Sequence, residues 1–378
     1  MYKVLTFGMT DNYGGVESVI MNYYRKFDQK KIKMDFLVTS SSEIAYSSEI
    51  KKYNGKIFTI PSRHSNPITY YKNVKEFFKT HAREYDCFWV NMNNLVNIDY
   101  LKLAKKYGIK RIIIHAHNTQ LMETGIKGKI REGIHKYNKK QLFRYATDFW
   151  ACSQDAANWF YDKKVLSKVC IIRNALREDK FSYKESNRAK LRKKYSLGNK
   201  TVIGNIGRLN YQKNQSFLLD IFAQYLVLDK SAKLLLIGKG EEEKALKDKA
   251  KKLNIASNVI FLGMKENVIP WYSVFDMFVF PSHFEGLGLV LLEAQANGVP
   301  VLATKDAIPA DVKVNENLEF ISLSKSAKYW ADKIKKNLDN NTRIKNKETI
   351  VTNFRKSNYD IDLEAERVEK LFLNTAIK

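Results

Sequence analysis

The segment Asp276–Gly298, DMFVFPSHFEGLGLVLLEAQANG, constrains the fold of this chain more than any other stretch. It begins with apolar, β-prone residues, turns at Pro281, passes through a loop with Gly286 and Gly288, and continues as a helix. Ligands of open α/β sheets bind at the carboxyl ends of the strands, where helices begin. A helix amino end offers unpaired N–H groups and a positive dipole to an anion, and glycine lets that anion approach the backbone. The segment therefore predicts a strand, a glycine loop and an anion-binding helix start.

Two carboxylates flank this helix start, Glu285 in the loop and Glu293 inside the helix. Helical side chains lean toward the amino end, so both acids could converge on one ligand whose anionic part lies at Gly288. Because carboxylates accept hydrogen bonds from hydroxyls, a nucleotide-sugar fits, with its diphosphate between two hydroxyl-bearing ends. The plain alternative is a pair of solvated acids, but Glu293 lies in the apolar run LGLVLLEAQA.

The alternation of β-prone and helical segments predicts an α/β fold with two doubly wound, Rossmann-like parallel sheets. We expect a first domain over 1–175 and a second over 176–357, with a polar, basic linker at Ala175–Lys200 and a ligand cleft between the domains. The closing helix, 358–378, could pack back on the first domain. The expected strands are Tyr2–Gly8, Met34–Thr39, Lys56–Pro61, Cys87–Met92, Arg111–His117, Thr147–Cys152, Thr201–Ile206, Lys233–Ile237, Val259–Leu262, Met277–Pro281 and Val299–Ala303.

The charge balance favours an anionic partner. The 378 residues carry a formal net charge of +25, and the first 175 hold 30 Lys plus Arg against 15 Asp plus Glu. The three cysteines, Cys87, Cys152 and Cys170, are widely spaced in apolar stretches, as in a reducing cytoplasm without a disulfide framework or metal site. We see no signal peptide and no apolar run of roughly 18 residues, so neither secretion nor a spanning helix is expected.

Two further loops could bind a diphosphate. Gly14 and Gly15 precede a helix after the first strand, where their backbone could close over the phosphates, although an ordinary turn is the alternative. In GRLNYQKN, Arg208 and Lys213 follow the first strand of the second domain. They could neutralise the charge that grows on a leaving nucleoside diphosphate, or be solvated cations in a basic chain.

Other residues could contact the base and the sugar. The turns after two later strands place Gly238, Gly263, Met264 and Lys265 where they could contact the nucleotide base, although plain strand-to-helix turns explain them as well. His115 and His117 end a strand of the first domain, and alternation points both to the same side. They could contact a sugar or acceptor, or be structural residues.

A basic amphipathic helix is predicted near Gly128–Tyr145, with an apolar stripe of Ile130, Ile134, Tyr137 and Leu142. Such a helix is typical of a membrane surface or another anionic partner, although a solvated surface helix is the alternative. Its cations are Lys127, Lys129, Arg131, Lys136, Lys139, Lys140 and Arg144.

Taken together, FPSHFEGLGLVLLEAQANGVPVLAT, GRLNYQKN and GGVES resemble the glycosyltransferases of the GT-B fold, specifically the large retaining family four and its EpsF-type capsule and exopolysaccharide enzymes. The resemblance covers nearly the whole chain. It implies retaining, metal-independent transfer from a nucleotide-sugar, expected to be a UDP-sugar, to a lipid-linked or saccharide acceptor. Because the first domain is basic, we also expect a cytoplasmic enzyme held peripherally at the inner face of the plasma membrane.

The resemblance assigns roles to residues at matching positions. It implies that Glu285 holds the donor sugar, Glu293 the ribose, and Gly15, Arg208, Lys213, Gly288 and Leu289 the diphosphate, while His115 or His117 contacts the sugar near the reacting carbon.

Two other functions stay open. A nucleotide-sugar epimerase would need no acceptor, and a nucleic-acid binder, suggested by charge alone, leaves the two glutamates unexplained.

Overall fold

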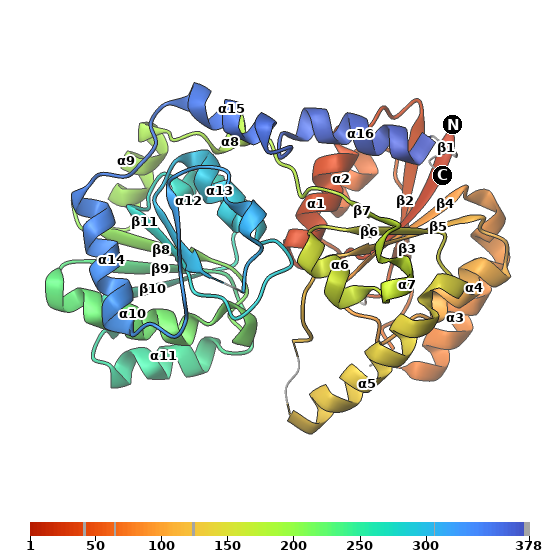
Figure 1. The fold of residues 1–378 in the computed structure, drawn as a ribbon, viewed down its shortest axis with the longest axis horizontal. Coiled ribbons are helices and arrows are strands. Elements are labelled where there is room, and N and C mark those ends of the chain that lie inside the picture. Colours follow the sequence, from red (N-terminus) through yellow and green to blue (C-terminus); the bar gives the residue numbers. More distant parts are fainter. Residues whose placement is uncertain (41–42, 64–65, 123–124, 306, 374–378) are drawn as a thin grey trace. The chain divides into compact units, whose positions relative to one another are not determined.

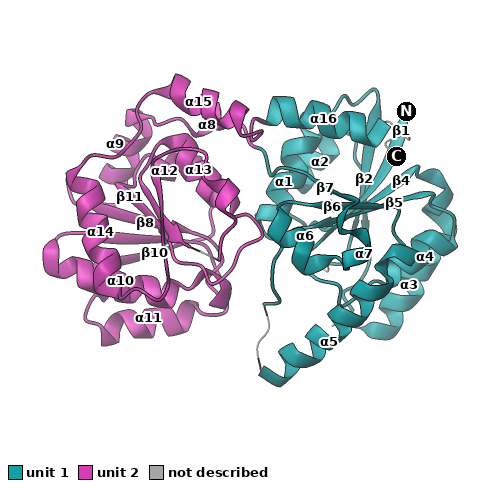
Figure 2. Cartoon of the chain, viewed as in Figure 1, with its two compact units in different colours: residues 1–175, 361–378 teal, residues 176–360 magenta. Residues whose placement is uncertain are grey.

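The computed structural model describes residues 1–40, 43–63, 66–122, 125–305 and 307–373. The chain divides into two compact units, coloured separately in Figure 2. Unit 1 comprises Met1–Ala175 and Ile361–Lys378, and unit 2 comprises Leu176–Asp360. The closing helix, α16 (Ile361–Leu373), belongs to unit 1, and residues 374–378 of the helix expected from the sequence lie outside the described part. Each unit is described by itself below.

Unit 1 contains, within the described residues, a seven-stranded sheet in the order β3-β2-β1-β4-β5-β6-β7, and every pairing in it is parallel. The central strand β4 is buried along its whole length, as expected for an apolar strand covered on both faces. Figure 1 shows α1, α2 and α16 on one side of this sheet and α3, α4 and α5 on the other. The strands are β1 (Tyr2–Phe7), β2 (Ile32–Val38), β3 (Ile57–Thr59), β4 (Cys87–Met92), β5 (Arg111–Ala116), β6 (Asp148–Ala151) and β7 (Val169–Ile171). The helices are α1 (Gly15–Tyr24), α2 (Ser47–Lys52), α3 (Pro67–His81), α4 (Asp99–Lys106), α5 (Gly125–Gln141), α6 (Gln154–Phe160) and α7 (Lys163–Leu166), with 3₁₀ turns η1 (Ala82–Glu84) and η2 (Leu142–Arg144).

Unit 2 repeats the plan with a parallel sheet that, in the described part, has six strands in the order β10-β9-β8-β11-β12-β13. Helices α10 and α11 lie on one side of it and α12 and α13 on the other (Figure 1). The strands are β8 (Val202–Ile206), β9 (Lys233–Ile237), β10 (Val259–Gly263), β11 (Met277–Phe280), β12 (Val301–Thr304) and β13 (Leu318–Ile321). The helices are α8 (Glu178–Phe181), α9 (Glu185–Lys194), α10 (Gln215–Leu228), α11 (Glu243–Lys252), α12 (Ile269–Tyr272), α13 (Leu289–Asn297), α14 (Ala327–Asp339) and α15 (Lys347–Lys356), with 3₁₀ turns η3 (Tyr211–Lys213), η4 (Ala256–Asn258) and η5 (Ala310–Val312).

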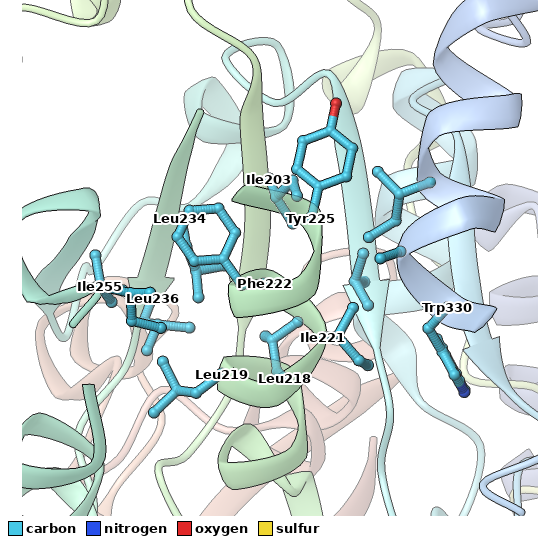
Figure 3. Close-up of a cluster of buried hydrophobic side chains, with 14 of the residues drawn as sticks. Ile203, Leu218, Leu219, Ile221, Phe222, Tyr225, Leu234, Leu236, Ile255 and Trp330 are labelled. Carbon is cyan, nitrogen blue, oxygen red and sulfur yellow. The ribbon is translucent and has the colours of Figure 1, made fainter. Parts of the chain in front are cut away.

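The core of unit 2 is built on the strongly apolar helix α10 (Figure 3). Its residues Leu218, Leu219 and Phe222 are fully buried beside strand residues of β8 and β9, and Trp330 of α14 packs in the same cluster. Each such side chain contributes about 1.5–3 kcal/mol by leaving water. This packing holds β8 and the loop that follows it in place.

The strand order reverses between β1 and β4 in unit 1 and between β8 and β11 in unit 2. Ligands of doubly wound sheets bind at such switch points, beyond the carboxyl ends of the two strands. In unit 2 the loop after β8 carries Arg208 and Lys213, and the loop after β11 carries Glu285. The topology therefore brings these separate motifs to one point.

The predicted fold class is confirmed, but the expected linker is wrong. Within Ala175–Lys200, all residues beyond Ala175 belong to unit 2 and include the helices α8 and α9. Arg188 and Arg192 of α9 bind Asp276, at 2.6 and 3.3 Å, and so fasten this polar segment to the sheet. The basic composition of this segment indicated a solvated connection. The two ion pairs that fasten it to the sheet cannot be read from residue spacing alone.

Among the described residues, none of the helices combines the length and the apolar character that a membrane span requires.

Candidate functional site

The helix α13 begins directly after Gly288, which adopts the left-handed conformation with φ +87°. Glycine enters this region without the strain that a Cβ adds. Because glycine occupies the N-cap position, the N-cap residue has no side chain that could bind the first N–H groups of the helix, the groups at which helix starts bind anions. Gly298, at φ +79°, ends the helix. The predicted order of strand, glycine loop and helix is confirmed.

A lysine and a glutamate meet beside this helix start. The Lys213 Nζ lies 2.7 and 2.9 Å from the two carboxylate oxygens of Glu285, and the side chains are only 16% and 6% exposed. The same ammonium lies 4.8 Å from the centre of the Phe280 ring. A Cβ placed on Gly288 would lie 3.7 Å from Glu285 Cγ, so the acid is next to the helix tip. The two motifs that the sequence singled out separately therefore form one buried pair.

The backbone fixes this pair in place. The His283 N–H donates to the carbonyl of Gln212 at 2.8 Å, and the Gln212 side-chain amide donates to the carbonyl of Phe284 at 3.1 Å. His283 also stacks on Tyr211, with ring centres 4.5 Å apart. The turn η3 and the loop after β11 are thus held together by backbone and ring contacts, which sequence reasoning did not find.

Glu293 lies deeper, on α13, with 8% of its surface exposed. Burial raises its pKa to about 7, although the Tyr272 hydroxyl, which donates to Glu293 Oε2 at 2.5 Å, opposes the rise. The apolar run around Glu293 predicted its burial correctly. Tyr272 was missed because α12 is a single short turn whose sequence, IPWY, indicates only packing.

Arg208 lies in the loop after β8 but not against Lys213. It binds Glu241 at 3.1 Å, and both side chains are more than half exposed. An exposed pair of this kind contributes less than about 1 kcal/mol, so Arg208 can exchange Glu241 for another anion at small cost.

The glycine turns expected to meet the base have a structural role as well. Gly238 has φ +143°, and a Cβ there would lie 1.9 Å from the carbonyl oxygen of Gly207. Its N–H donates to the Gly263 carbonyl at 3.0 Å. Met264 is 43% exposed and Lys265 partly exposed. Base contacts through this turn stay a prediction.

The two histidines of unit 1 point to the same side, as predicted, with ring centres 4.0 Å apart. His115 is fully buried, with its ring centre 6.1 Å from those of Trp89 and Trp150. His117, beyond the end of β5, is 8% exposed, and its Nε2 lies 2.8 Å from Asn91 Oδ1. Burial lowers the pKa of both, to about 3 for His117, so both rings are neutral near pH 7. The geometry favours His117 as the one that can reach a ligand.

The glycine loop of unit 1 leads into α1, whose first residue is Gly15. Apart from its chain neighbours and the backbone of its own helix, no described atom lies within 4 Å of the position that a Cβ on Gly15 would take. Glu17, missed by the sequence analysis, is 5% exposed and accepts from the Thr10 hydroxyl at 2.5 Å. It closes the loop from within, and burial raises its pKa.

The basic helix exists as α5, and most of its apolar stripe faces outward. Ile126, Ile130 and Ile134, one helical turn apart, are 81%, 61% and 39% exposed, and Tyr137 is 69% exposed. Leu142 was placed on this stripe incorrectly, because the chain leaves α5 for η2 there and Leu142 is 1% exposed.

The cations of α5 differ in availability. The Lys139 Nζ donates to the carbonyls of Asn158 and Trp159, at 3.1 and 2.6 Å, which ties it to the end of α6. Lys136 pairs with Glu132 at 2.6 Å on the exposed surface. The remaining predicted cations, Lys127, Lys129, Arg131, Lys140 and Arg144, are exposed or partly exposed. Among the described residues, no group of three or more His, Cys, Asp or Glu side chains is arranged to hold a metal ion.

Comparison with known proteins gives one consistent result. A model of the family described as "Glycosyl transferases group 1" matches residues 187–357. EpsF of Bacillus subtilis (strain 168), whose name describes it as a glycosyltransferase, is 30% identical over 331 residues, or 85% of this chain and 84% of EpsF. CapM of Staphylococcus aureus, a capsular polysaccharide biosynthesis glycosyltransferase, is 32% identical over 54% of each chain.

Solved structures agree on the fold. Anabaena Alr3699/HepE in complex with UDP and glucose superposes with a TM-score of 0.78 at 17% identity, covering 99% of this chain and 100% of that one. Sucrose-phosphate synthase from Thermosynechococcus elongatus gives a TM-score of 0.76 at 17% identity, covering 99% and 98%. The chain therefore belongs to the group 1 family of glycosyltransferases and has the GT-B fold.

Proposed function

We propose that this protein transfers a sugar, with retention of configuration, from a UDP-sugar to a lipid-linked or saccharide acceptor in exopolysaccharide or capsule biosynthesis. The observation that carries this is the buried Lys213–Glu285 pair beside the start of α13, where glycine is the N-cap residue. The capsule role named for CapM and the UDP bound to Alr3699/HepE support the pathway and the donor class.

The donor diphosphate would lie on the first N–H groups of α13, at Gly288 and Leu289. There it competes with Glu285 for the Lys213 ammonium. Once the phosphates hold Lys213, the Glu285 oxygens are released to accept hydrogen bonds from the sugar hydroxyls. One ion pair in the free protein thus becomes two ligand contacts, and the buried carboxylate is never left without a partner.

The remaining groups complete the donor site. The Glu293 carboxylate would accept hydrogen bonds from the ribose hydroxyls, while the Tyr272 hydroxyl donates to its other oxygen. Arg208 would turn from Glu241 to the diphosphate. In unit 1, Gly15 and the neutral His117 keep the roles that the family resemblance assigns to them, toward the diphosphate and toward the sugar near its anomeric carbon.

In the transfer step, the acceptor hydroxyl attacks the anomeric carbon on the face from which the diphosphate leaves. The bond between that carbon and the phosphate oxygen breaks, and the leaving oxygen takes the acceptor proton. Lys213, Arg208 and the α13 dipole supply positive charge for the leaving UDP, so we expect no metal requirement.

We also propose that unit 1 rests on an anionic membrane surface through α5. The exposed Ile126, Ile130 and Ile134 would enter the lipid headgroup region, and the cations beside them would contact lipid phosphates. This would place the enzyme at the inner face of the plasma membrane, where a lipid-linked acceptor is found.

Replacing Glu285 by Ala tests the donor site. We expect UDP release in the presence of acceptor to fall by about 10²-fold or more, because a preorganised contact to the sugar is lost. UDP alone should still raise the melting temperature, since Lys213 and α13 remain. The control is Glu316→Ala, which removes a 93% exposed acid of the same unit and should change neither quantity. Full activity of the Glu285 variant would refute the site.

A further inference from the structure

A cavity of about 950 Å³ lies in unit 2 at the edge of the sheet opposite to the candidate donor site. Thr201, Asp276 and Pro300 line it, and they directly precede β8, β11 and β12. Because the sheet is parallel, these residues mark the amino ends of the strands, whereas Lys213 and Glu285 follow the carboxyl ends. Helix α9, the end of α14 and the segment around Arg343 form the other walls.

Three guanidinium groups line this cavity around a single carboxylate. Arg188 and Arg192 lie 2.6 and 3.3 Å from the Asp276 carboxylate, and the three side chains are 22%, 8% and 21% exposed. Arg343 has no carboxylate partner among the described residues. It donates to the Asn297 side-chain oxygen at 2.7 Å and to the carbonyl of Phe275, both neutral acceptors.

The surroundings of Arg343 disfavour its positive charge. Burial, together with the neighbouring charge of Arg188, lowers the pKa of Arg343 to about 10, whereas the ordinary value is 12.5. Buried charges in proteins are usually balanced by an opposite charge. Here the arginines exceed the carboxylate by two.

A purely structural role explains part of this arrangement. The arginines donate to backbone carbonyls of residues 198, 200, 273, 274 and 275, and so close the turns that enter β8 and β11. Carbonyls, however, carry no net charge and do not offset the repulsion. The other charged residues on the walls are Lys335, which pairs with Asp339, and Lys193, Glu185 and Asp229, which together carry one negative charge. The walls as a whole therefore keep one surplus positive charge, and Arg343 is the guanidinium without an ion pair among the described residues.

We propose that this cavity binds a small phosphorylated anion against Arg188 and Arg343. The planar guanidinium presents paired N–H donors that match phosphate oxygens, and two of them converge on the same space. The site also contacts the far ends of the donor-site elements. Arg343 holds Asn297, the last residue of α13, and Asp276 precedes β11. An occupied cavity would therefore stabilise unit 2, whether or not the donor assignment is correct.

Thermal unfolding with defined anions tests the proposal. Inorganic phosphate and inorganic pyrophosphate should raise the melting temperature above that in sodium chloride of equal ionic strength. The rise should persist in Lys213→Ala, which removes the cation of the donor site. In Arg343→Gln, the dissociation constant for phosphate should increase at least tenfold. Glucose 1-phosphate, compared with inorganic phosphate, distinguishes a phosphate ester from the free ion.

A variant that is expected to tighten phosphate binding separates a specific loss of binding from misfolding. Asp276→Asn removes the competing carboxylate, so it should tighten phosphate binding even though it destabilises the turn. Arg188→Gln is the second variant, and it should weaken phosphate binding if Arg343→Gln does not fold. The proposal is overturned if chloride stabilises equally, if the effect disappears in Lys213→Ala but survives in the arginine variants, or if Asp276→Asn weakens binding.

Discussion

Glu293 shows how one buried side chain couples stability to pH. Its ordinary pKa of 4.5 is raised to about 7 in the folded protein, so the folded state holds the proton more tightly than the unfolded chain does. The corresponding stabilisation is complete below pH 4.5 and is lost as the pH rises through 7, a change of about 3 kcal/mol. Glu293→Gln stays neutral throughout. Urea unfolding at a series of pH values should therefore show the wild type losing about that much stability relative to Glu293→Gln between pH 5 and 8. A difference that does not change with pH would contradict the assignment.

The two histidines should separate by phenotype. His117→Ala removes a ring that is 8% exposed just beyond the strand end, and we expect kcat/KM for transfer to fall about 10²-fold while UDP binding changes little and the melting temperature falls less than in His115→Ala. His115→Ala instead opens a cavity beside Trp89 and Trp150 and should cost about 2–4 kcal/mol of unfolding free energy. Both variants are assayed with the same donor, which is chosen beforehand by thermal shift. If His115→Ala lost as much activity as His117→Ala and kept its stability, His115 would be the histidine that contacts the sugar.

At the scale of elements, α5 carries the membrane prediction. Ile126 and Ile130 are 81% and 61% exposed on one stripe, so replacing both by Ser should not disturb the core. We expect the double variant to lose most of its co-sedimentation with vesicles that contain anionic lipid, because apolar insertion and charge act together. Val227→Ser, on α10 of unit 2, removes an equally exposed apolar side chain, 74% exposed, and should have no effect. Unchanged sedimentation of the α5 variant would leave α5 as a solvated helix.

Elements with a strong local signal could be predicted from the sequence. The strand, glycine loop and helix of Asp276–Gly298 appeared as expected, since apolar runs, Gly288 and Gly298 mark each boundary. Helices α8 and α9 did not, because they are held by distant partners. Arg188 and Arg192 reach Asp276 across more than eighty residues, and spacing within α9 says nothing of it.

For the whole molecule, the sheet order explains what sequence reasoning could and could not do with the site. Lys213 and Glu285 were both singled out, but as separate motifs, and their ion pair follows only from the adjacency of β8 and β11. Tyr272 and Asn91 carry no local signal and become visible only through the groups they contact. In a doubly wound fold, the candidate site residues can thus be predicted from the loop sequences. The residues that they contact depend on the strand order and cannot be predicted in this way.

The path of the chain through two units makes a further prediction. The chain leaves unit 1 at Ala175, builds unit 2, and returns to unit 1 with α16. Phe372 of α16 is fully buried, with its ring 5.2 to 5.7 Å from those of Trp150, Trp89 and Phe27. Phe372→Ala should therefore lower the stability of unit 1 by about 3–5 kcal/mol.

Calorimetry with and without UDP can assign this loss to one unit. The transition that UDP moves upward belongs to the donor-binding unit, which we place in unit 2, and Phe372→Ala should leave its midpoint and its UDP shift unchanged while the other transition falls. Leu363→Ala, which removes a 53% exposed side chain on the same helix, should change neither transition by more than about 0.5 kcal/mol. If Phe372→Ala instead lowered the UDP-sensitive transition alone, α16 would support unit 2 and the division of the chain into folding units would have to be redrawn.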